Sequence, residues 1–433
     1  MLDLKWHFCY NFKVDKIKTS INISFRLCLN LKGSNIYMID NNKLKVLMGI
    51  DCYFPSVDGV VQTMHNYLLE LNKENEGYSI APILKKKFEG ELPYKNFWCK
   101  SIYVPIYGER YPTPNKDKKL NAEIDNLNLD IVHMHSPFAI CNYGVKITRK
   151  KGIPIVATFH TKFRDAFYDK LKNKRLTESL CKKIGKNLNK VDEVFIANES
   201  MLEELRSYGY TGKVSYMPLG TEWEKSQKEQ SSIDLVNNTY NIGKDEITFS
   251  FVGRLEKVKN IDFTLNALKQ LKEQNYQFKF IIVGKGPELE NLKLQIEKSG
   301  LSNNVIITGF IERSMLKAIY SRTDVLLFPS DFDTFGLVKV EASAFDTPTL
   351  TLENSCAGYG IIDNENGYLI KNDLNDYVEK LKHIIANKAD IVQIGKRAGE
   401  TLYINWHEAT QKLIKKYKDL IAENKQKTEN ENN

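Results

Sequence analysis

The chain has 433 residues, of which 42% are hydrophobic, and it carries a formal net charge of +8. This length exceeds what one ordinary hydrophobic core organises, so two domains are expected. The modest positive charge permits an acidic partner but gives no reason to expect nucleic acid. Seven scattered cysteines without a CxxC pair argue against a disulfide framework and a structural zinc site, and they indicate a reducing, cytoplasmic compartment. No apolar run approaches the roughly 20 residues that span a bilayer, so we expect a soluble chain that meets a membrane only at its surface.

Residues 1–42 differ from the rest of the chain because they show neither helical nor strand periodicity. They also lack the layout of a signal peptide, since Asp3 and Lys5 interrupt the start. One interpretation is that the natural start is Met38 and that the preceding residues come from an over-extended reading frame. The other is an N-terminal arm that is disordered or loosely docked. Mass spectrometry of the native protein distinguishes them, because a peptide from residues 21–32 contradicts the first interpretation.

Strands and helices alternate from residue 43 to residue 221, which predicts a doubly wound parallel sheet for this first domain. The strand at 45–50 runs into a helix at 60–71 with apolar residues at helical spacing. Gly59 lies at this turn, where it either lets a ligand approach the backbone or is simply a turn residue. Further strands are predicted at 78–84, 101–106, 130–134, 153–159, 193–197 and 214–217, and further helices at 137–151, 165–189 and 199–207.

A polar linker at 222–245 separates this series from a second domain of similar size at 246–405. The last periodic helix is predicted at 406–422, and the tail at 423–433 is too polar to pack, so we expect it to be disordered. The fold class is therefore α/β, with two Rossmann-like domains. Strands of the second domain are predicted at 247–252, 278–283, 305–307, 325–328, 349–352 and 368–370, with a helix at 261–271 after the first of them.

The stretch SDFDTFGLVKVEASA at 330–344 combines a strand end, a polar loop and a helix start. The unpaired N–H groups of a helix start attract anions. Asp331 and Asp333 lie in the loop, and Glu341 lies about a turn and a half inside the helix. Carboxylates beside an anion site indicate a ligand that carries both phosphate and sugar hydroxyls.

Ligands of doubly wound domains bind beyond the carboxyl ends of the strands, so candidate residues are sought there. Arg254 and Lys259 follow a strand end and could clamp a diphosphate, each charge contributing about 4 kcal/mol at 4 Å from a phosphate. The alternative for this pair is a solvated basic loop. In the first domain, His133, His135 and His160 occupy corresponding positions.

Several motifs in order resemble the GT-B glycosyltransferases of family four, from about residue 43 to residue 422. They are VDGVVQTM, HMHSPF, ATFHTKF, FVGRLEKVKN, VGKGPELENL, ITGF and SDFDTFGLVKVEASA. The resemblance implies two Rossmann-like domains facing a central cleft, with the C-terminal helix crossing back to the first domain. It implies that the second domain binds a nucleoside-diphosphate sugar and that the first binds the acceptor.

The resemblance also implies a role for each candidate residue. Arg254 and Lys259 hold the diphosphate, the residue at Asp333 faces the donor sugar, and His160 lies near the transferred sugar. Glu341 holds the ribose hydroxyls. The remaining donor contacts are made by backbone: Phe310 and Ile311 at the base, and Gly59, Phe335, Gly336 and Leu337 at the phosphates.

The implied reaction is hexosyl transfer with retention of configuration, in which the diphosphate departs and no cofactor is needed besides the donor substrate. Fixed cations and N–H donors stabilise the leaving oxygen without a metal ion, and one such donor is worth about 3–4 kcal/mol. No pair of carboxylates in a glycosidase arrangement is evident, so hydrolysis of sugar chains is disfavoured.

Other interpretations of the function and of the site remain open. Asp331-Phe332-Asp333 spells DxD, a metal-binding signature in another glycosyltransferase fold, so a metal role at this loop is an alternative. The family usually has Glu where this chain has Asp333, and Phe345-Asp346 replaces a small residue and Gly. The shorter carboxylate falls about 1.5 Å short, so a non-catalytic partner or stabilising subunit with this fold is a second hypothesis. A Rossmann oxidoreductase is a third, although the VGKGPEL stretch at 283–289 lacks the third glycine of GxGxxG.

The segment 162–190 carries ten basic and three acidic residues interleaved with aromatic and aliphatic ones. Such a basic amphipathic helix binds anionic membranes at roughly 1 kcal/mol per surface cation. Alternatively, it is a solvated face whose apolar side belongs to the core. The membrane interpretation predicts a lipid or lipid-linked glycan acceptor and a peripheral location on the inner membrane face.

Overall fold

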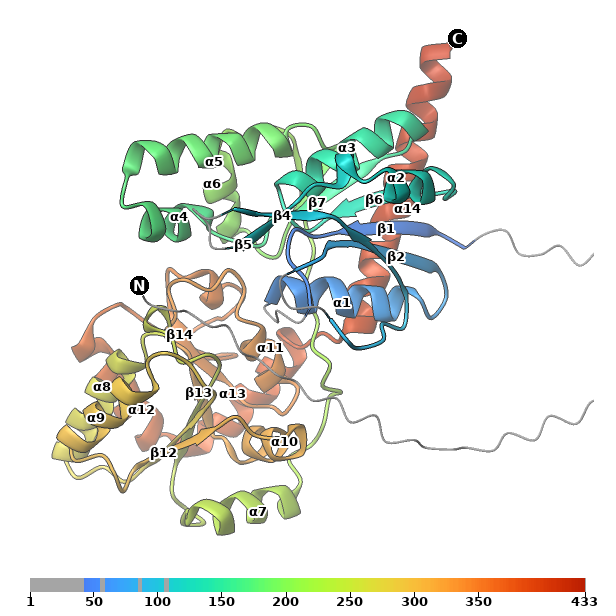
Figure 1. The fold of residues 1–433 in the computed structure, drawn as a ribbon. Helices are drawn as coiled ribbons and strands as arrows, with labels where there is room; N and C mark the ends of the chain where they lie inside the picture. The colour runs from blue at the N-terminus through green and yellow to red at the C-terminus, as the bar shows by residue number, and fades with distance from the viewer. Residues whose placement is uncertain (1–42, 55–58, 85–87, 105–108, 433) are drawn as a thin grey trace, which may run out of the picture.

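The computed structural model describes residues 43–54, 59–84, 88–104 and 109–432, so the N-terminal arm and both interpretations of it lie outside the described residues. The described chain forms two domains, each built on a parallel sheet with helices on both faces (Figure 1). This confirms the predicted α/β class with two doubly wound domains.

The first sheet has seven described strands in the order β3-β2-β1-β6-β7-β8-β9, and all neighbouring strands are parallel. Side chains alternate between the faces of a strand, so Val46 and Met48 join one apolar cluster and Leu47 joins another. Helices α1 and α14 contribute to the first cluster, and α3 and α5 contribute to the second. The strands are β1 (Lys45–Gly49), β2 (Glu76–Pro82), β3 (Lys95–Cys99), β6 (Ile131–Met134), β7 (Ile155–Thr158), β8 (Glu193–Ile196) and β9 (Lys213–Tyr216). The helices are α1 (Gly59–Leu71), η1 (Pro114–Lys116), α2 (Lys118–Asp125), α3 (Ala139–Lys151), α4 (Phe163–Leu171), α5 (Lys174–Leu188) and α6 (Ser200–Ser207).

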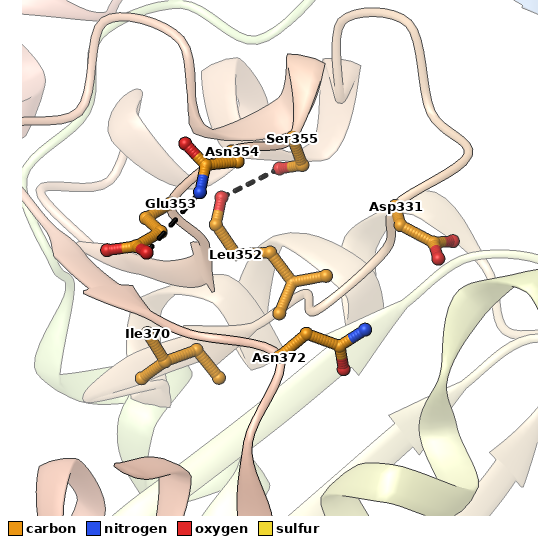
Figure 2. A pocket seen from close by; sticks show the side chains of 7 residues that line it. All are labelled: Asp331, Leu352, Glu353, Asn354, Ser355, Ile370 and Asn372. Carbon is orange, nitrogen blue, oxygen red and sulfur yellow. Dashed lines mark hydrogen bonds between the residues drawn. The ribbon is translucent and has the colours of Figure 1, made fainter.

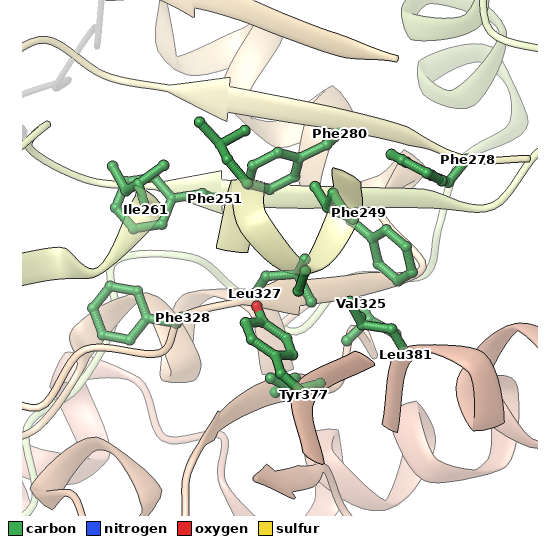
Figure 3. Close-up of a cluster of buried hydrophobic side chains, with 14 of the residues drawn as sticks. Phe249, Phe251, Ile261, Phe278, Phe280, Val325, Leu327, Phe328, Tyr377 and Leu381 are labelled. Carbon is green, nitrogen blue, oxygen red and sulfur yellow. The ribbon is translucent and has the colours of Figure 1, made fainter. Parts of the chain in front are cut away.

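The second sheet has six described strands in the order β12-β11-β10-β13-β14-β15, again all parallel. Phe249 and Phe251 of β10 and Phe280 of β11 belong to a buried cluster that includes Tyr377 and Leu381 of α12 (Figure 3). The strand order reverses between β10 and β13, and such a switch point opens a crevice for ligands. The strands are β10 (Thr248–Val252), β11 (Lys279–Val283), β12 (Val305–Gly309), β13 (Val325–Leu327), β14 (Thr349–Leu352) and β15 (Tyr368–Ile370). The helices are α7 (Gln230–Tyr240), η2 (Lys257–Lys259), α8 (Ile261–Glu273), α9 (Leu289–Lys298), α10 (Arg313–Arg322), α11 (Leu337–Ser343), η3 (Cys356–Gly358), α12 (Leu374–Ala386) and α13 (Lys388–Thr401).

Helix α14 (Trp406–Asn432) returns from the second domain and packs on the first, which confirms the predicted crossover (Figure 1). Its buried residues Leu413, Tyr417 and Leu420 belong to the cluster under β1. The expectation of a disordered tail at 423–433 is wrong for its described part, because α14 continues to Asn432. The polar composition of this segment does not prevent a helix, but it leaves the side chains at 425–430 exposed to solvent.

Three local expectations differ from the structure. The helix predicted at 165–189 is two helices, because Lys172 adopts a left-handed conformation (φ 47°) and the side chain of Asn173 caps α5. The linker at 222–245 contains α7, whose buried Val236 packs in the second domain. The segment predicted as a sheet strand at 101–106 instead forms β4 (Ser101–Val104), paired antiparallel with β5 (Glu109–Pro112). Strand β3 and helix α2 have no counterpart among the predicted elements.

Candidate active site

Loops that follow strands of the two sheets contact one another across the domain boundary. The amide of Asn198, after β8, donates to the carbonyl oxygens of Thr334 at 2.8 Å and Cys356 at 3.2 Å. The ammonium of Lys162, after β7, lies 3.5 Å from the carbonyl oxygen of Asp331. The carboxyl ends of the two sheets therefore face each other, as expected from the resemblance. The predicted site residues lie in the loops that follow the strands or in the helices that these loops lead into.

Lys259 and Asp333 meet at the switch point of the second sheet. The Lys259 ammonium lies 2.7 and 2.6 Å from the two carboxylate oxygens of Asp333, and the side chains are only 14% and 23% exposed. Two contacts fix this geometry: Asn260 donates to the carbonyl of Pro329 at 2.9 Å, and the Asp333 N–H donates to Ser330 Oγ at 3.4 Å. The cation predicted to hold the diphosphate and the carboxylate predicted to face the sugar are thus one ion pair.

Arg254 follows β10 and forms an ion pair with Glu256, with 2.7 Å between its Nη2 and the carboxylate. The backbone here lies against the loop after β11. A Cβ on Gly284, which has φ +144°, would lie 1.8 Å from the carbonyl oxygen of Gly253. Only glycine allows the loops after β10 and β11 to approach this closely, and the approach fixes the position of Arg254.

Glu341 lies in α11, and its carboxylate accepts a hydrogen bond from the Tyr320 hydroxyl at 2.6 Å. Burial raises the pKa of Glu341, while the bond from Tyr320 lowers it and burial dominates. The Tyr320 ring stacks on Phe345, with centroids 5.6 Å apart, which holds the hydroxyl in place. The aromatic residue that departs from the family pattern at 345 therefore supports the partner of Glu341.

The predicted backbone contacts at the phosphates lie at the start of α11, which begins at Leu337 and is preceded by Gly336 with φ +74°. Phe310 follows β12, is 46% exposed, and has the Lys285 ammonium 6.0 Å from its ring centroid. Its neighbour Ile311 is partly buried and packs against a core cluster of the second domain instead. Gly59 is the first residue of α1, and a Cβ there would meet nothing within 4 Å. The space beside Gly59 is open among the described residues.

His160 belongs to a connected set of rings in the first domain. Its Nε2 lies 2.9 Å from Nδ1 of the buried His135, and the two rings stack. His133 in turn bonds the Tyr417 hydroxyl of α14 at 2.5 Å and the Thr158 hydroxyl at 2.6 Å. Burial lowers the pKa of His160 to about 3, and burial lowers the pKa values of His133 and His135 as well. All three rings are therefore neutral at pH 7.

Sequence reasoning missed Lys339, a buried lysine in the 330–344 stretch. Its side chain is turned inward, where the ammonium donates to the carbonyl oxygens of Ala357 and Tyr359, both at 2.7 Å. Burial lowers its pKa to about 7. A single lysine among apolar residues of a helix gave no signal of this role, because it equally fits an exposed position. Lys339 fixes η3 against α11, and so positions the loop that Asn198 contacts.

The DxD residues diverge in their contacts. Asp333 engages Lys259, whereas Asp331 lines a pocket at the ends of β13, β14 and β15 (Figure 2). Within the described ranges, no group of three or more His, Cys, Asp or Glu side chains is placed to hold a metal ion. In the same part of the chain, no helix is both long and apolar enough to cross a membrane.

Two domains that are each built on a parallel sheet, and whose strand-end loops contact each other, define the GT-B class of fold. The structure of the Anabaena protein HepE in complex with UDP shares this fold, with a TM-score of 0.70 and 14% identity over 87% of this chain and 100% of that one. The family described as Glycosyltransferase Family 4 matches residues 57–224, and Glycosyl transferases group 1 matches residues 233–401. The chain belongs to the glycosyltransferase family that these two matches describe, one for each domain.

Two curated relatives are alpha-monoglucosyldiacylglycerol synthases. The protein of Streptococcus pneumoniae is 25% identical over 330 residues, which cover 75% of each chain. The protein of Acholeplasma laidlawii is 25% identical over 371 residues, which cover 80% of this chain and 90% of the relative. The similarity extends over both domains in each case.

Proposed function

We propose that the protein transfers a hexose from a nucleoside-diphosphate sugar to a lipid or glycan acceptor, with retention of configuration and without a metal ion. The observation that carries this proposal is the pairing of Lys259 with Asp333 at the switch point of the second sheet. His160 of the first domain stands two residues before Lys162, which reaches the same loop. The acceptor class is supported by two relatives that are alpha-monoglucosyldiacylglycerol synthases.

We assign the base, the ribose and the diphosphate of the donor to residues beyond the carboxyl ends of the strands of the second sheet. The exposed Phe310 after β12 would lie at the base, and Glu341, oriented by Tyr320, would accept hydrogen bonds from the ribose hydroxyls. Arg254 and Lys259 after β10 would hold the diphosphate. A UDP-containing structure of similar fold supports a nucleotide at such a site.

In the proposed reaction, the bond between the anomeric carbon and the diphosphate oxygen breaks. A bond to the acceptor oxygen forms on the same face of the sugar, and the acceptor proton passes to the departing diphosphate. Lys259 and Arg254 would stabilise the negative charge that develops on the leaving oxygen, together with the N–H groups at Phe335, Gly336 and Leu337. The neutral His160 would offer a hydrogen bond to the transferred sugar without adding a positive charge beside the cationic anomeric carbon.

A thermal-shift screen of UDP-, GDP- and ADP-sugars tests the donor assignment, because a ligand that binds the native state raises the melting temperature. We expect stabilisation by one nucleotide class and slow hydrolysis of that donor. Stabilisation by NAD with none by nucleotide sugars would favour the oxidoreductase alternative. Binding without turnover by the purified chain would favour the non-catalytic partner, for which the shorter carboxylate of Asp333 is the motivating observation.

We further propose that α4 and α5 bind an anionic membrane surface from the cytoplasmic side. Helix α4 has no buried residue, and Tyr168 and Leu176 are 48% and 46% exposed. The exposed lysines of α5 add positive charge beside these apolar side chains. A peripheral location of this kind brings the active site to a lipid acceptor.

Liposome sedimentation tests the membrane surface. Replacing Lys182, Lys183 and Lys186 with Glu should weaken binding to anionic vesicles by on the order of 100-fold, at about 1 kcal/mol for each cation removed. The matched control replaces the exposed Lys412, Lys415 and Lys418 of α14 with Glu. Equal loss in both variants, or equal binding of wild type to neutral vesicles, would refute the proposed surface.

A further inference from the structure

The HMHSPF stretch contributes two histidines to the first domain, and the proposed function uses neither of them. His133 lies in β6, and His135 is the first residue after that strand. Side chains two residues apart on a strand point to the same face, and the two rings have centroids 4.2 Å apart. Both are almost fully buried, at 0% and 2% exposed. Buried polar rings need hydrogen-bond partners to offset the loss of water, so their partners indicate their roles.

The hydrogen bonds of the two rings differ. His133 uses both ring nitrogens, which bond the hydroxyl groups of Tyr417 and Thr158. His135 uses only Nδ1, which lies 2.9 Å from Nε2 of His160. The Nε2 atom of His135 is buried and has no hydrogen-bond partner among the described residues. The side chain of His135 is therefore directed to the residue that is proposed to lie near the transferred sugar.

The backbone on both sides of this contact is fixed by neighbouring strands. The N–H of His135 donates to the carbonyl oxygen of Gly49 in β1 at 2.7 Å. The N–H of Phe159, the residue before His160, donates to the carbonyl oxygen of Phe195 in β8 at 2.8 Å. The planes of the two histidine rings differ by only 15°. Since neither ring is carried by a free loop, their contact fixes the orientation of the His160 ring.

The contact occupies one nitrogen of His160 and leaves the other available. His160 is only partly buried, and its Nδ1 bonds no other described residue. Because a ring nitrogen is a donor or an acceptor according to where the proton lies, the bond made by Nε2 determines what Nδ1 can offer to a ligand.

Two arrangements of the protons satisfy the contact between two neutral rings. In the first, Nδ1–H of His135 donates to a bare Nε2 of His160, so His160 carries its own proton on Nδ1. In the second, Nε2–H of His160 donates to His135, whose proton then lies on the buried Nε2. That N–H would have no acceptor among the described residues, and folded proteins leave buried N–H groups unpaired more rarely than they leave acceptors under-used. The first arrangement is therefore favoured.

Resting on the proposed glycosyltransferase function, we propose that His135 is a positioning residue for His160. Its Nδ1–H bond holds the His160 ring in one orientation and in the Nδ1–H tautomer, so that His160 presents an N–H donor to a hydroxyl group of the transferred sugar. His135 acts through His160 and does not touch the substrate. Without it, the ring of His160 could rotate or change tautomer and present a bare nitrogen instead.

Nitrogen NMR of the full chain, labelled with ¹⁵N-histidine and free of any substrate, tests the proton positions. The protonated and bare nitrogens of a neutral imidazole differ widely in ¹⁵N chemical shift, and spectra of His135→Asn and His160→Asn assign the signals. We expect both His135 and His160 to carry the proton on Nδ1 at neutral pH. A proton on Nε2 of His160 would overturn the inference, and this measurement does not depend on activity.

Kinetics of His135 variants test the effect on the reaction. His135→Phe keeps an aromatic ring but no nitrogen, and it should lower kcat about tenfold while the KM for the donor changes less than about twofold, as expected for one lost hydrogen bond that orients a reacting group. His135→Asn places an amide N–H near the position of Nδ1, so kcat should return to within about threefold of wild type. In a His160→Asn background, His135→Phe should add little further loss, because the two residues act as a unit.

His65→Phe is the matched control. His65 is a histidine of the same domain whose Nδ1 bonds the Tyr94 hydroxyl and whose ring contacts those of Phe54 and Tyr94. It should keep the wild-type kcat, and thermal unfolding of every variant checks that the fold is retained. Equal loss in His135→Phe and His135→Asn, or fully additive losses with His160→Asn, would overturn the positioning role. Absence of any nucleotide-sugar binding by the wild type would instead refute the proposed function, whatever the tautomer.

Discussion

The ammonium of Lys259 contacts both carboxylate oxygens of Asp333, at 2.7 and 2.6 Å. The two residues belong to loops after adjacent strands, and the pairing crosses the switch point between β10 and β13. Family resemblance assigns them to different parts of the donor. In the proposed donor complex, this ion pair would link the charge on the diphosphate to the position of the sugar.

Removing either member of this pair should reduce transfer in a non-additive way. Lys259→Ala should lower kcat/KM by about 10²–10³, as loss of one donor to the leaving oxygen does. Asp333→Ala in the Lys259→Ala background should add little further loss, since contacting residues couple. Steady-state kinetics of both single variants and the double variant measure this coupling. Fully additive losses would mean that the two residues act independently.

Lengthening the carboxylate should be tolerated better than deleting it. Asp333→Glu extends the side chain by about 1.5 Å and keeps the negative charge beside Lys259. We expect kcat within about tenfold of wild type, with a changed preference among donor sugars, whereas Asp333→Ala should lose about 10²-fold. A panel of donor sugars assayed with both variants measures this difference. Equal activity of Asp333→Ala and wild type would show that residue 333 has no part in the reaction.

Chelation should leave transfer intact. Because Asp333 is engaged by Lys259, and cations are proposed to stabilise the leaving group, we expect the same rate with and without EDTA. A strict requirement for manganese, restored after EDTA treatment by adding the metal back, would support the DxD alternative.

Histidine titration should not limit the reaction above about pH 4. The pKa of His160 is lowered to about 3 from 6.5 because its ring is desolvated, so the ring stays neutral through the usual assay range. We expect kcat/KM of wild type and His160→Asn to follow parallel curves from pH 5 to 8, at different absolute rates. An acidic limb near pH 6.5 that disappears in His160→Asn would contradict the neutral state.

The lowered pKa of His160 also predicts a contribution to the free energy of unfolding that is lost as the pH falls from about 6.5 to about 3.

Lys339 should make stability depend on alkaline pH. Its pKa is lowered to about 7 from 10.5, so between these values the unfolded state binds more protons than the native state. The free energy of unfolding should therefore rise with pH above 7, by up to about 1.4 kcal/mol per unit. Lys339→Met should remove this rise, as measured by urea unfolding at pH 7, 8 and 9. The exposed Lys418→Met is the control and should keep it. Parallel behaviour of Lys339→Met and wild type would contradict the lowered pKa.

Hydrophobic periodicity located most parallel strands, because their central residues are buried on both faces and read as apolar runs. It failed where conformation depends on contacts distant in sequence. The segment at 101–106 is apolar enough for a sheet strand, but Ile102 and Tyr103 are each 54% exposed in an antiparallel hairpin. Likewise, lysine is not a residue type that favours the left-handed conformation, so the break between α4 and α5 at Lys172 could not be predicted.

For the site, the positions at strand ends could be predicted, but the partners could not. Arg254 and Lys259 were identified from their place after a strand, yet their carboxylate partners depend on loop geometry. The bond between His133 and Tyr417 joins residues 284 positions apart, and only the return of α14 brings them together. The buried contacts of Lys339 were missed for the same reason.

The chain passes between the domains twice, and the two passages are joined at one point. Thr221 forms a β-bridge with Asn405, its N–H donates to the carbonyl of Ile404 at 2.9 Å, and its own carbonyl accepts from the Trp406 N–H at 3.2 Å. A Cβ on Gly220 would lie 2.6 Å from the Asn405 and Trp406 backbone, so no side chain fits between them. Any rotation of one domain against the other must bend both passages together, which makes this short ladder a common pivot rather than two independent tethers.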